Sequence, residues 1–110
     1  MNQSEEIELS IEAAKEKIAL AEGLKQLSAN QLFKRLILDR FLKDHAVNMV
    51  YAKVAMGHQD PTNQTYIQNQ LNAIGGLNQY FQLILQEGKI AKETLESHME
   101  EQRLALEEEA

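Results

Sequence analysis

Apolar residues recur every three or four positions along nearly the whole chain, which is the spacing of amphipathic helices. In the first part of the chain they step four, three, four and three, at Ile7, Ile11, Ala14, Ile18 and Ala21. Leu20, Leu24 and Leu27 widen this stripe. Ser4 precedes two glutamates and is the expected N-cap. The pattern therefore predicts a first helix over about residues 4–27.

A second helix is predicted over about residues 29–56. The segment SANQ, Ser28–Gln31, has the spacing of a capping box, in which side chains satisfy the first free backbone N–H groups. Gly57 follows the last apolar residue and is expected to close the helix in a left-handed conformation. The residues of this helix predicted for the core are Phe33, Ile37, Phe41 and Val50.

The segment GHQDPTNQ, residues 57–64, is the main break and contains the only proline. Asp60 is the expected cap and Pro61 the first-turn residue of a third helix over about residues 61–86. Gly88 is expected to end or bend this helix, and a looser apolar pattern predicts a fourth segment over about residues 89–107. The core residues predicted for the third helix are Ile74, Leu77, Phe81 and Ile84.

These elements predict an all-α fold, either a three- to four-helix antiparallel bundle or a helical hairpin with long helices. No segment alternates polar and apolar residues as a half-buried strand does. With 110 residues and 44% hydrophobic content, the chain is expected to form a single helical domain over residues 1–110. The acidic end at 107–110 has little apolar area to bury and is expected to be frayed.

Charge is distributed unevenly around a net value of −6. Residues 1–12 contain four glutamates and no base, and residues 87–110 contain eight glutamates and three bases. Between them, four bases alternate with Asp39 and Asp44, at Lys34, Arg35, Arg40 and Lys43. This cluster can bind nucleic acid or an acidic partner, but a solvated face with local salt bridges is the favoured interpretation. Acidic ends and 5% aromatic content argue against nucleic acid.

Residues 66–86 lack any charge, although 25% of the chain is charged. Their amides exclude a membrane span, because each would have to be buried in hydrocarbon. Two adjacent glycines inside a helix cost roughly 1–2 kcal/mol relative to alanines, so a close helix approach or a kink is expected there. Neutral amides lose water at lower cost than charges do. We therefore predict a contact surface at Gln68, Asn72, Gly75, Gly76, Gln79 and Gln82, the alternative being a neutral face without a role.

No constellation of catalytic residues is evident. Cysteine is absent, and the three histidines are far apart and have no HExxH-like spacing. Gly75 and Gly76 stand within a helical stripe and do not follow a strand as a phosphate-binding loop does. The sequence therefore predicts a non-enzymatic protein without metal or cofactor. Its acidic N-terminus does not resemble an export signal, so a cytoplasmic location is expected.

Two segments carry a resemblance to a known class of proteins. They are FKRLILDRFLKDHAVNMVYA and, after a short loop, IQNQLNAIGGLNQYFQLILQEGKIA, with the patterns ILD-x-FLK and AIG-x-L-x-x-Y. Over about residues 20–95 the chain resembles small helical proteins of tailed bacteriophages, encoded near genes for virion structure and assembly. The resemblance implies a virion-associated or assembly-accessory role without enzyme activity, in the host cytoplasm or the virion.

Three functional hypotheses follow. The first is a helical interaction protein, a phage assembly accessory that forms a homo-oligomer, with a dimer favoured, or binds a larger protein. The second is a small acidic regulator that binds and inhibits a host protein at a basic site. The third is a helical nucleic-acid-binding module that uses the four clustered bases. Apolar self-association should persist at high salt, whereas both charge-driven modes should weaken.

Overall fold

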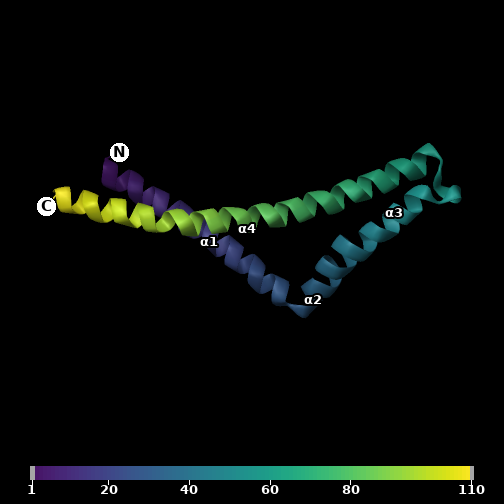
Figure 1. Cartoon of the computed structure of the whole chain (residues 1–110), viewed down its shortest axis with the longest axis horizontal. Helices are drawn as coiled ribbons and strands as arrows, with labels where there is room; N and C mark the ends of the chain where they lie inside the picture. Colours follow the sequence, from purple (N-terminus) through teal and green to yellow (C-terminus); the bar gives the residue numbers. More distant parts are fainter. Residues whose placement is uncertain (1, 110) are drawn as a thin grey trace. The chain divides into compact units, whose positions relative to one another are not determined.

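The computed structural model describes residues 2–109, which are helical almost throughout and contain no strand (Figure 1). The elements are α1 (Gln3–Ala29), α2 (Gln31–Phe33), the π-helix η1 (Lys34–His45), α3 (Ala46–Val54), the 3₁₀ turn η2 (Met56–His58) and α4 (Pro61–Glu109). The predicted all-α class is confirmed. Each helix in this part of the chain is too short or too polar to cross a membrane.

The chain divides into two compact units. Unit 1 combines Met1–Lys25 with Leu83–Ala110, and unit 2 consists of Gln26–Gln82. In unit 1 the first part of α1 packs on the last part of α4. In unit 2 the helices from α2 to α3 pack on the first part of α4, with the rings of Phe33 and Phe81 5.9 Å apart.

The first two helices begin at asparagines and not at the predicted serines. Asn2 accepts a hydrogen bond from the backbone N–H of Glu5 at 2.8 Å, and Glu5 accepts one from the backbone N–H of Asn2 at 3.4 Å. This reciprocal pair is a capping box, so the assignment of Ser4 as cap was wrong. Asn30 caps α2 by accepting from Phe33 N–H at 3.1 Å. The predicted box at Ser28 was also wrong, because α1 continues to Ala29.

The break between α3 and α4 agrees with the sequence at one residue and differs at another. Asp60 caps α4 as predicted, accepting from the backbone N–H of Asn63 at 3.1 Å. Gly57 does not close a helix in a left-handed conformation, since no glycine among residues 2–109 has a positive φ. A side-chain amide ends the helix in place of a left-handed glycine. Gln59 donates to the carbonyls of Lys53 and Ala55, at 3.0 and 2.9 Å, and so satisfies the last acceptors of α3.

The predicted helix over residues 29–56 is interrupted by the π-helix η1, whose backbone hydrogen bonds join residues five apart. Along it and at its junction with α3, partly buried residues come in adjacent pairs that recur every four positions, at Ile37 and Leu38, Phe41 and Leu42, and His45 and Ala46. An α-helix repeats every 3.6 residues, so a four-residue repeat drifts around it. A π-helix has more residues in each turn, so the same four-residue repeat drifts around it in the opposite direction. This drift offsets the drift in the flanking α-helices.

Helix α4 runs without interruption from Pro61 to Glu109. Gly88 does not end it, and the segment predicted at 89–107 is its continuation. Gly88 is instead buried in unit 1, where a side chain at this position would overlap Cβ of Ala21 and lie 3.3 Å from the carbonyl oxygen of Lys17. Nearby, Lys92 Nζ lies 2.6 Å from Glu22 and lowers the pKa of that carboxyl through their hydrogen bond.

The buried hydrophobic residues are few, and nearly half of them are alanines. In unit 1 Ile7, Ile11 and Ala105 form a cluster beside Leu95. In unit 2 the buried residues are Ile67 and Ile74, the latter as predicted. The other predicted core residues are partly buried, except that Val50 is 56% exposed, so its assignment to the core was wrong. The end of α4 is helical to Glu109, and fraying of 107–110 stays a prediction, with Ala110 outside the described residues.

Replacing Gly88 with Ala should destabilise the fold, although alanine is the better helix former by about 1 kcal/mol. The added methyl group would displace α1 at Ala21, and overpacking of this kind costs about 1–3 kcal/mol. Gly23→Ala is the matched control, because no atom lies within 4 Å of a side chain there, and it should be neutral or stabilising. Urea unfolding of both variants measures the difference. Equal stabilisation by both would contradict the close approach.

The Asp60 cap predicts a pH effect on α4. The backbone N–H and side-chain amide of Asn63 lower the pKa of Asp60, so this contribution to stability is present above the carboxyl's unfolded value and is lost as the pH falls below about 4. Asp60→Asn keeps a capping oxygen but does not ionise. The melting temperature measured by thermal unfolding should therefore fall more between neutral and acidic pH for the wild type than for Asp60→Asn. A parallel decline would show that Asp60 does not contribute.

Candidate interaction surfaces

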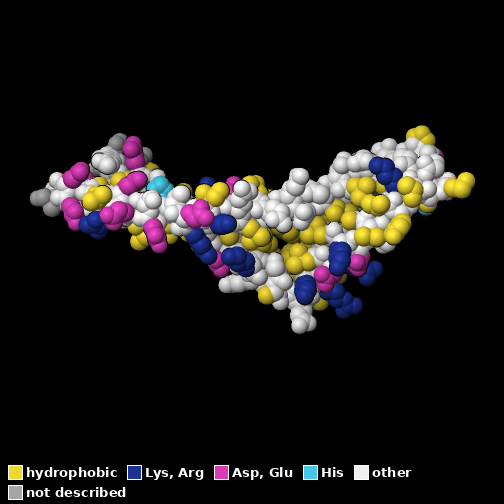
Figure 2. All heavy atoms as spheres, viewed as in Figure 1, with side chains coloured by type: hydrophobic (Ala, Val, Ile, Leu, Met, Phe, Trp, Pro, Cys, Tyr) yellow, Lys and Arg dark blue, Asp and Glu magenta, His cyan; other side chains and the backbone are white. Residues whose placement is uncertain are grey.

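An exposed apolar row lies along α3. It consists of Val47, Val50, Tyr51 and Val54, at the i, i+3, i+4 and i+7 positions of one helix face, and these side chains are 49, 56, 70 and 74% exposed. The opposite face of α3, at Met49 and Ala52, is partly buried in unit 2. Figure 2 shows hydrophobic side chains gathered over this helix. The spacing of these residues in the sequence does not show that the face is uncovered.

The charge-free part of α4 presents a second exposed surface, here called the amide face. Its members are Gln68, Asn72, Gly75, Gly76, Gln79 and Gln82, all exposed and away from the buried Ile67 and Ile74 on α4. Gln68 donates to Asn72 at 2.9 Å. No atom lies within 4 Å of a side chain added at Gly75 or Gly76, so the predicted helix approach does not occur there within residues 2–109. Within the chain, that approach occurs at Gly88.

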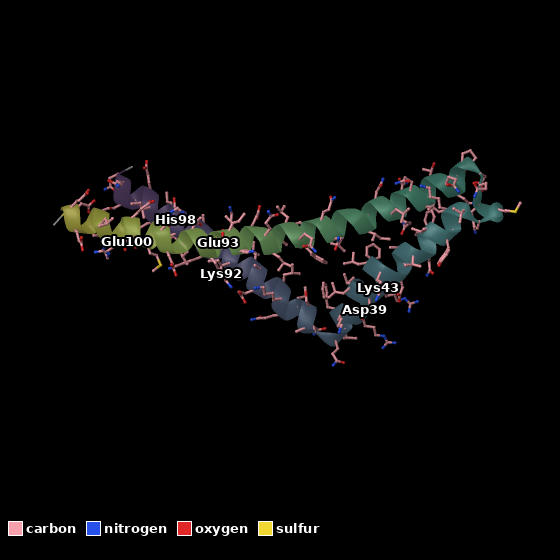
Figure 3. All side chains as sticks on the ribbon, in the orientation of Figure 1. Asp39, Lys43, Lys92, Glu93, His98 and Glu100 are labelled. Atoms are coloured by element: carbon pink, nitrogen blue, oxygen red, sulfur yellow. The ribbon has the colours of Figure 1, made fainter. Side chains whose placement is uncertain are left out.

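The basic surface consists of Lys34, Arg35, Arg40 and Lys43, all exposed on η1 and at its start. Asp39 and Asp44 stand four residues from three of these bases, which is a pairing distance on helices. Nevertheless, within residues 2–109 no ion pair involves any of them. The expectation of local salt bridges was therefore wrong. Figure 3 shows Asp39 and Lys43 extending from the same helix without converging.

Two shallow grooves border the basic surface in unit 2. One lies where α1 ends and α2 begins, and it is lined by Lys34 and Arg35 together with the apolar Leu32 and Leu38. The other lies along η1, where Arg40 adjoins Leu36, Phe41 and His45. Leu32 and Leu36 are 67 and 56% exposed. Cationic and apolar groups therefore occur side by side, a combination that suits a protein partner with both acidic and apolar side chains.

The two acidic ends of the sequence form one acidic surface on unit 1. Residues 2–12 and 93–109 contribute eleven exposed glutamates and a single Lys or Arg, Arg103. The ends meet because Ile7 and Ile11 of α1 pack with Ala105 of α4, and Ser4 Oγ donates to Glu109 at 2.7 Å. Figure 2 shows acidic side chains over this part of the unit. The sequence revealed two separate acidic ends but not their convergence.

Arg103 neutralises only part of this surface. Its guanidinium donates to Glu100 and to Glu107, the latter at 2.7 Å, and these are the only ion pairs formed by the eleven glutamates within the described chain. The hydrogen bond from Arg103 lowers the pKa of Glu100, and the same contact raises the pKa of Arg103. Most of the acidic surface is thus available to an external cation.

The histidines occupy separate environments. His45 Nε2 lies 2.9 Å from the amide oxygen of Gln70, and its ring stacks on Phe41 with centroids 5.7 Å apart. His98 is partly buried on α4, where its Nδ1 has no hydrogen-bond partner. Among residues 2–109 no three His, Asp or Glu side chains are grouped to hold a metal ion. These contacts account for His45 as a packing residue between η1 and α4.

Comparisons with protein families, with curated proteins and with solved structures find no match to the chain.

Proposed function

We propose that the chain is a non-enzymatic helical interaction protein that forms a homodimer through unit 2. The exposed apolar row of α3 carries this proposal. Burying one large apolar side chain contributes about 1.5–3 kcal/mol, so four of them on one helix face form a strong association site. Met56 extends the apolar surface just beyond α3 and is 94% exposed. A contiguous apolar surface of this kind marks a protein contact.

The dimer proposed here completes a helical bundle. Unit 2 alone packs one helical segment, α2 to α3, against the first part of α4. A second copy related by twofold symmetry brings two further helices to the apolar row, which gives the four-helix arrangement that buries such faces. The bundle predicted from the sequence is therefore proposed to form between chains.

The amide face is proposed as a second contact, for a further copy or a larger protein. Gly75 and Gly76 leave the backbone of α4 open to a neighbouring helix, since nothing within the described chain fills the space beside them. The surrounding amides can be buried at lower cost than charged side chains and can hydrogen-bond to one another. Both features suit close helix packing at this surface.

A role in bacteriophage virion assembly is proposed from the sequence resemblance alone, with the protein acting in the host cytoplasm or in the virion. Self-association of a small helical protein is compatible with such an accessory role. We expect genes for virion structural proteins to flank its coding sequence, and the protein to be detected by mass spectrometry in purified particles or assembly intermediates. A chromosomal setting without phage genes would argue against this role.

A second candidate function is an acidic regulator that inhibits a host protein at a basic site. The exposed acidic surface of unit 1 favours it, because only two of its eleven glutamates are paired with a base. This function predicts a salt-sensitive complex with a basic host protein. It does not require the apolar row, and loss of the row should leave that complex intact.

Val50→Lys should weaken the dimer by about tenfold or more, because it places a charge in the apolar row and removes apolar burial worth about 1.5 kcal/mol. Asn48→Lys is the control, since it adds the same exposed side chain to α3 outside the row. Light scattering across a concentration series at high salt measures the effect. A wild-type chain that stays monomeric at every concentration would refute the dimer.

Gly76→Leu should weaken any assembly that uses the amide face, because leucine would fill the space left for a neighbouring helix. Gly76→Ala should be tolerated and should raise helix stability by up to about 1 kcal/mol. Light scattering reports assembly, and circular dichroism reports helicity in both variants. Assembly indifferent to Gly76→Leu would remove the amide face from the interface while leaving the α3 contact in place.

A further inference from the structure

We propose that copies of the chain also make a head-to-tail contact, in which the acidic surface of unit 1 in one copy docks on the basic surface of unit 2 in another. This contact goes beyond the proposed dimer, because it joins two different surfaces and is driven by charge. The proposal rests on the opposite charges of two surfaces whose charged side chains are largely without ion-pair partners in the described chain.

The basic surface is open to a partner. Its four cations are exposed and form no ion pair within residues 2–109, although Asp39 and Asp44 are close in sequence. An external carboxylate therefore need not displace an internal partner. The cations also occur on a single helical stretch, so several of them can contact one surface at the same time, which strengthens charge pairing beyond that of isolated surface pairs.

The acidic surface offers matching groups in a regular arrangement. Glu101, Leu104 and Glu108 follow one another at i, i+3 and i+7 and so share one face of α4. Neither Glu101 nor Glu108 is paired with a base in the described chain. This face therefore presents two free carboxylates that flank an apolar side chain.

Apolar groups on the two surfaces also correspond. Leu104 and Leu106 are 46 and 54% exposed on the acidic surface. On the other side, the groove that contains Lys34 and Arg35 is also lined by Leu32 and Leu38. Docking can thus combine burial of leucines with charge pairing at the rim, which is the usual composition of a specific protein interface.

A second copy fits the basic surface better than nucleic acid does. The net charge of −6 and the eleven glutamates of the acidic surface would repel a polyanion from the same chain. The acidic surface of another copy, in contrast, is always present at the same concentration as the basic surface. Because the contact joins unlike surfaces, its repetition gives a ring if it closes and an open chain of subunits if it does not.

Exchanging the charges tests the contact. Arg35→Glu with Arg40→Glu replaces two cations of the basic surface by carboxylates, and Glu101→Lys with Glu108→Lys replaces the two free carboxylates beside Leu104 by cations. In about 0.1 M salt each variant alone should lose the assembly beyond the dimer, whereas an equimolar mixture should regain a complex, because the unchanged acidic surface of the first variant meets the unchanged basic surface of the second. Lys15→Glu with Lys53→Glu reverses as many charges elsewhere and should assemble as the wild type does.

Sedimentation velocity of the full chain provides the measurement, with circular dichroism to verify folding. Wild-type association beyond the dimer should weaken by about tenfold or more in 1 M salt, where the screening length falls from about 10 Å to about 3 Å. The apolar dimer should persist in 1 M salt. A chain that is monomeric in 1 M salt would therefore contradict the dimer. A chain that forms nothing larger than a dimer at low salt would contradict the head-to-tail contact.

Three results would overturn the proposal. One is a mixture of the two reversed variants that fails to associate although both are folded. Another is a wild-type change with salt that does not depend on protein concentration, which would place the charge contact within one chain. The third is binding of a short DNA duplex that is lost in Arg35→Glu with Arg40→Glu while self-association is unchanged, which would assign the basic surface to nucleic acid.

Discussion

A helix with apolar residues on a wide arc needs more than one neighbouring helix to cover them, and each unit of this protein supplies only one. Among residues 2–109, α1 has α4 alone as its partner in unit 1, and in unit 2 the stretch from α2 to α3 likewise packs only on α4. The side of each helix that faces its partner is buried or partly buried, and apolar residues elsewhere on its circumference meet water. The apolar row of α3 follows directly from this shortage of neighbours.

The side chains at the contact between α1 and α4 determine how close the two helices come. Ala14, Ala21, Ala91 and Ala105 are buried in unit 1, and Gly88 faces Ala21. Small residues bring two helices close and bury little apolar area per residue. Alongside the buried Ile7, Ile11 and Leu24, unit 1 therefore depends on close packing of these small residues, with the Lys92–Glu22 ion pair nearby. Exposed ion pairs contribute little by themselves, so the packing at Gly88 is the more important of the two.

The helical class and the break at Asp60 could be predicted because they depend on neighbours in sequence. Helical spacing of apolar residues and the short-range bond from Asp60 to Asn63 are local properties. The choice of Asn2 and Asn30 over nearby serines was missed, since several residues in each segment are competent caps. The π-helix was also missed, because a spacing of four residues, as at Ile37 and Phe41, is also common in α-helices.

The candidate surfaces depended on information that the sequence does not contain. The amides and glycines of α4 were recognised as one uncharged face, and the four bases as one cluster. Whether Val50 is covered depends on how many helices surround α3, so its exposure could not be read from its spacing. The convergence of the two acidic ends likewise required the packing of Ile7 and Ile11 on Ala105, a contact between residues far apart in the chain.

The π-helical form of Lys34–His45 decides whether the cations of the basic surface face carboxylates of their own helix or an external ligand. An α-helix of the same sequence would offer Arg35 and Arg40 intrahelical carboxylates four residues away, in Asp39 and Asp44. The observed helix leaves these arginines without such partners. A ligand that binds the free cations more tightly than the paired ones therefore draws the segment toward the π form, by its difference in affinity for the two states. Ligand binding at the basic surface is thus linked to the choice between the α- and π-helical conformations of this segment, and a change in one should accompany a change in the other.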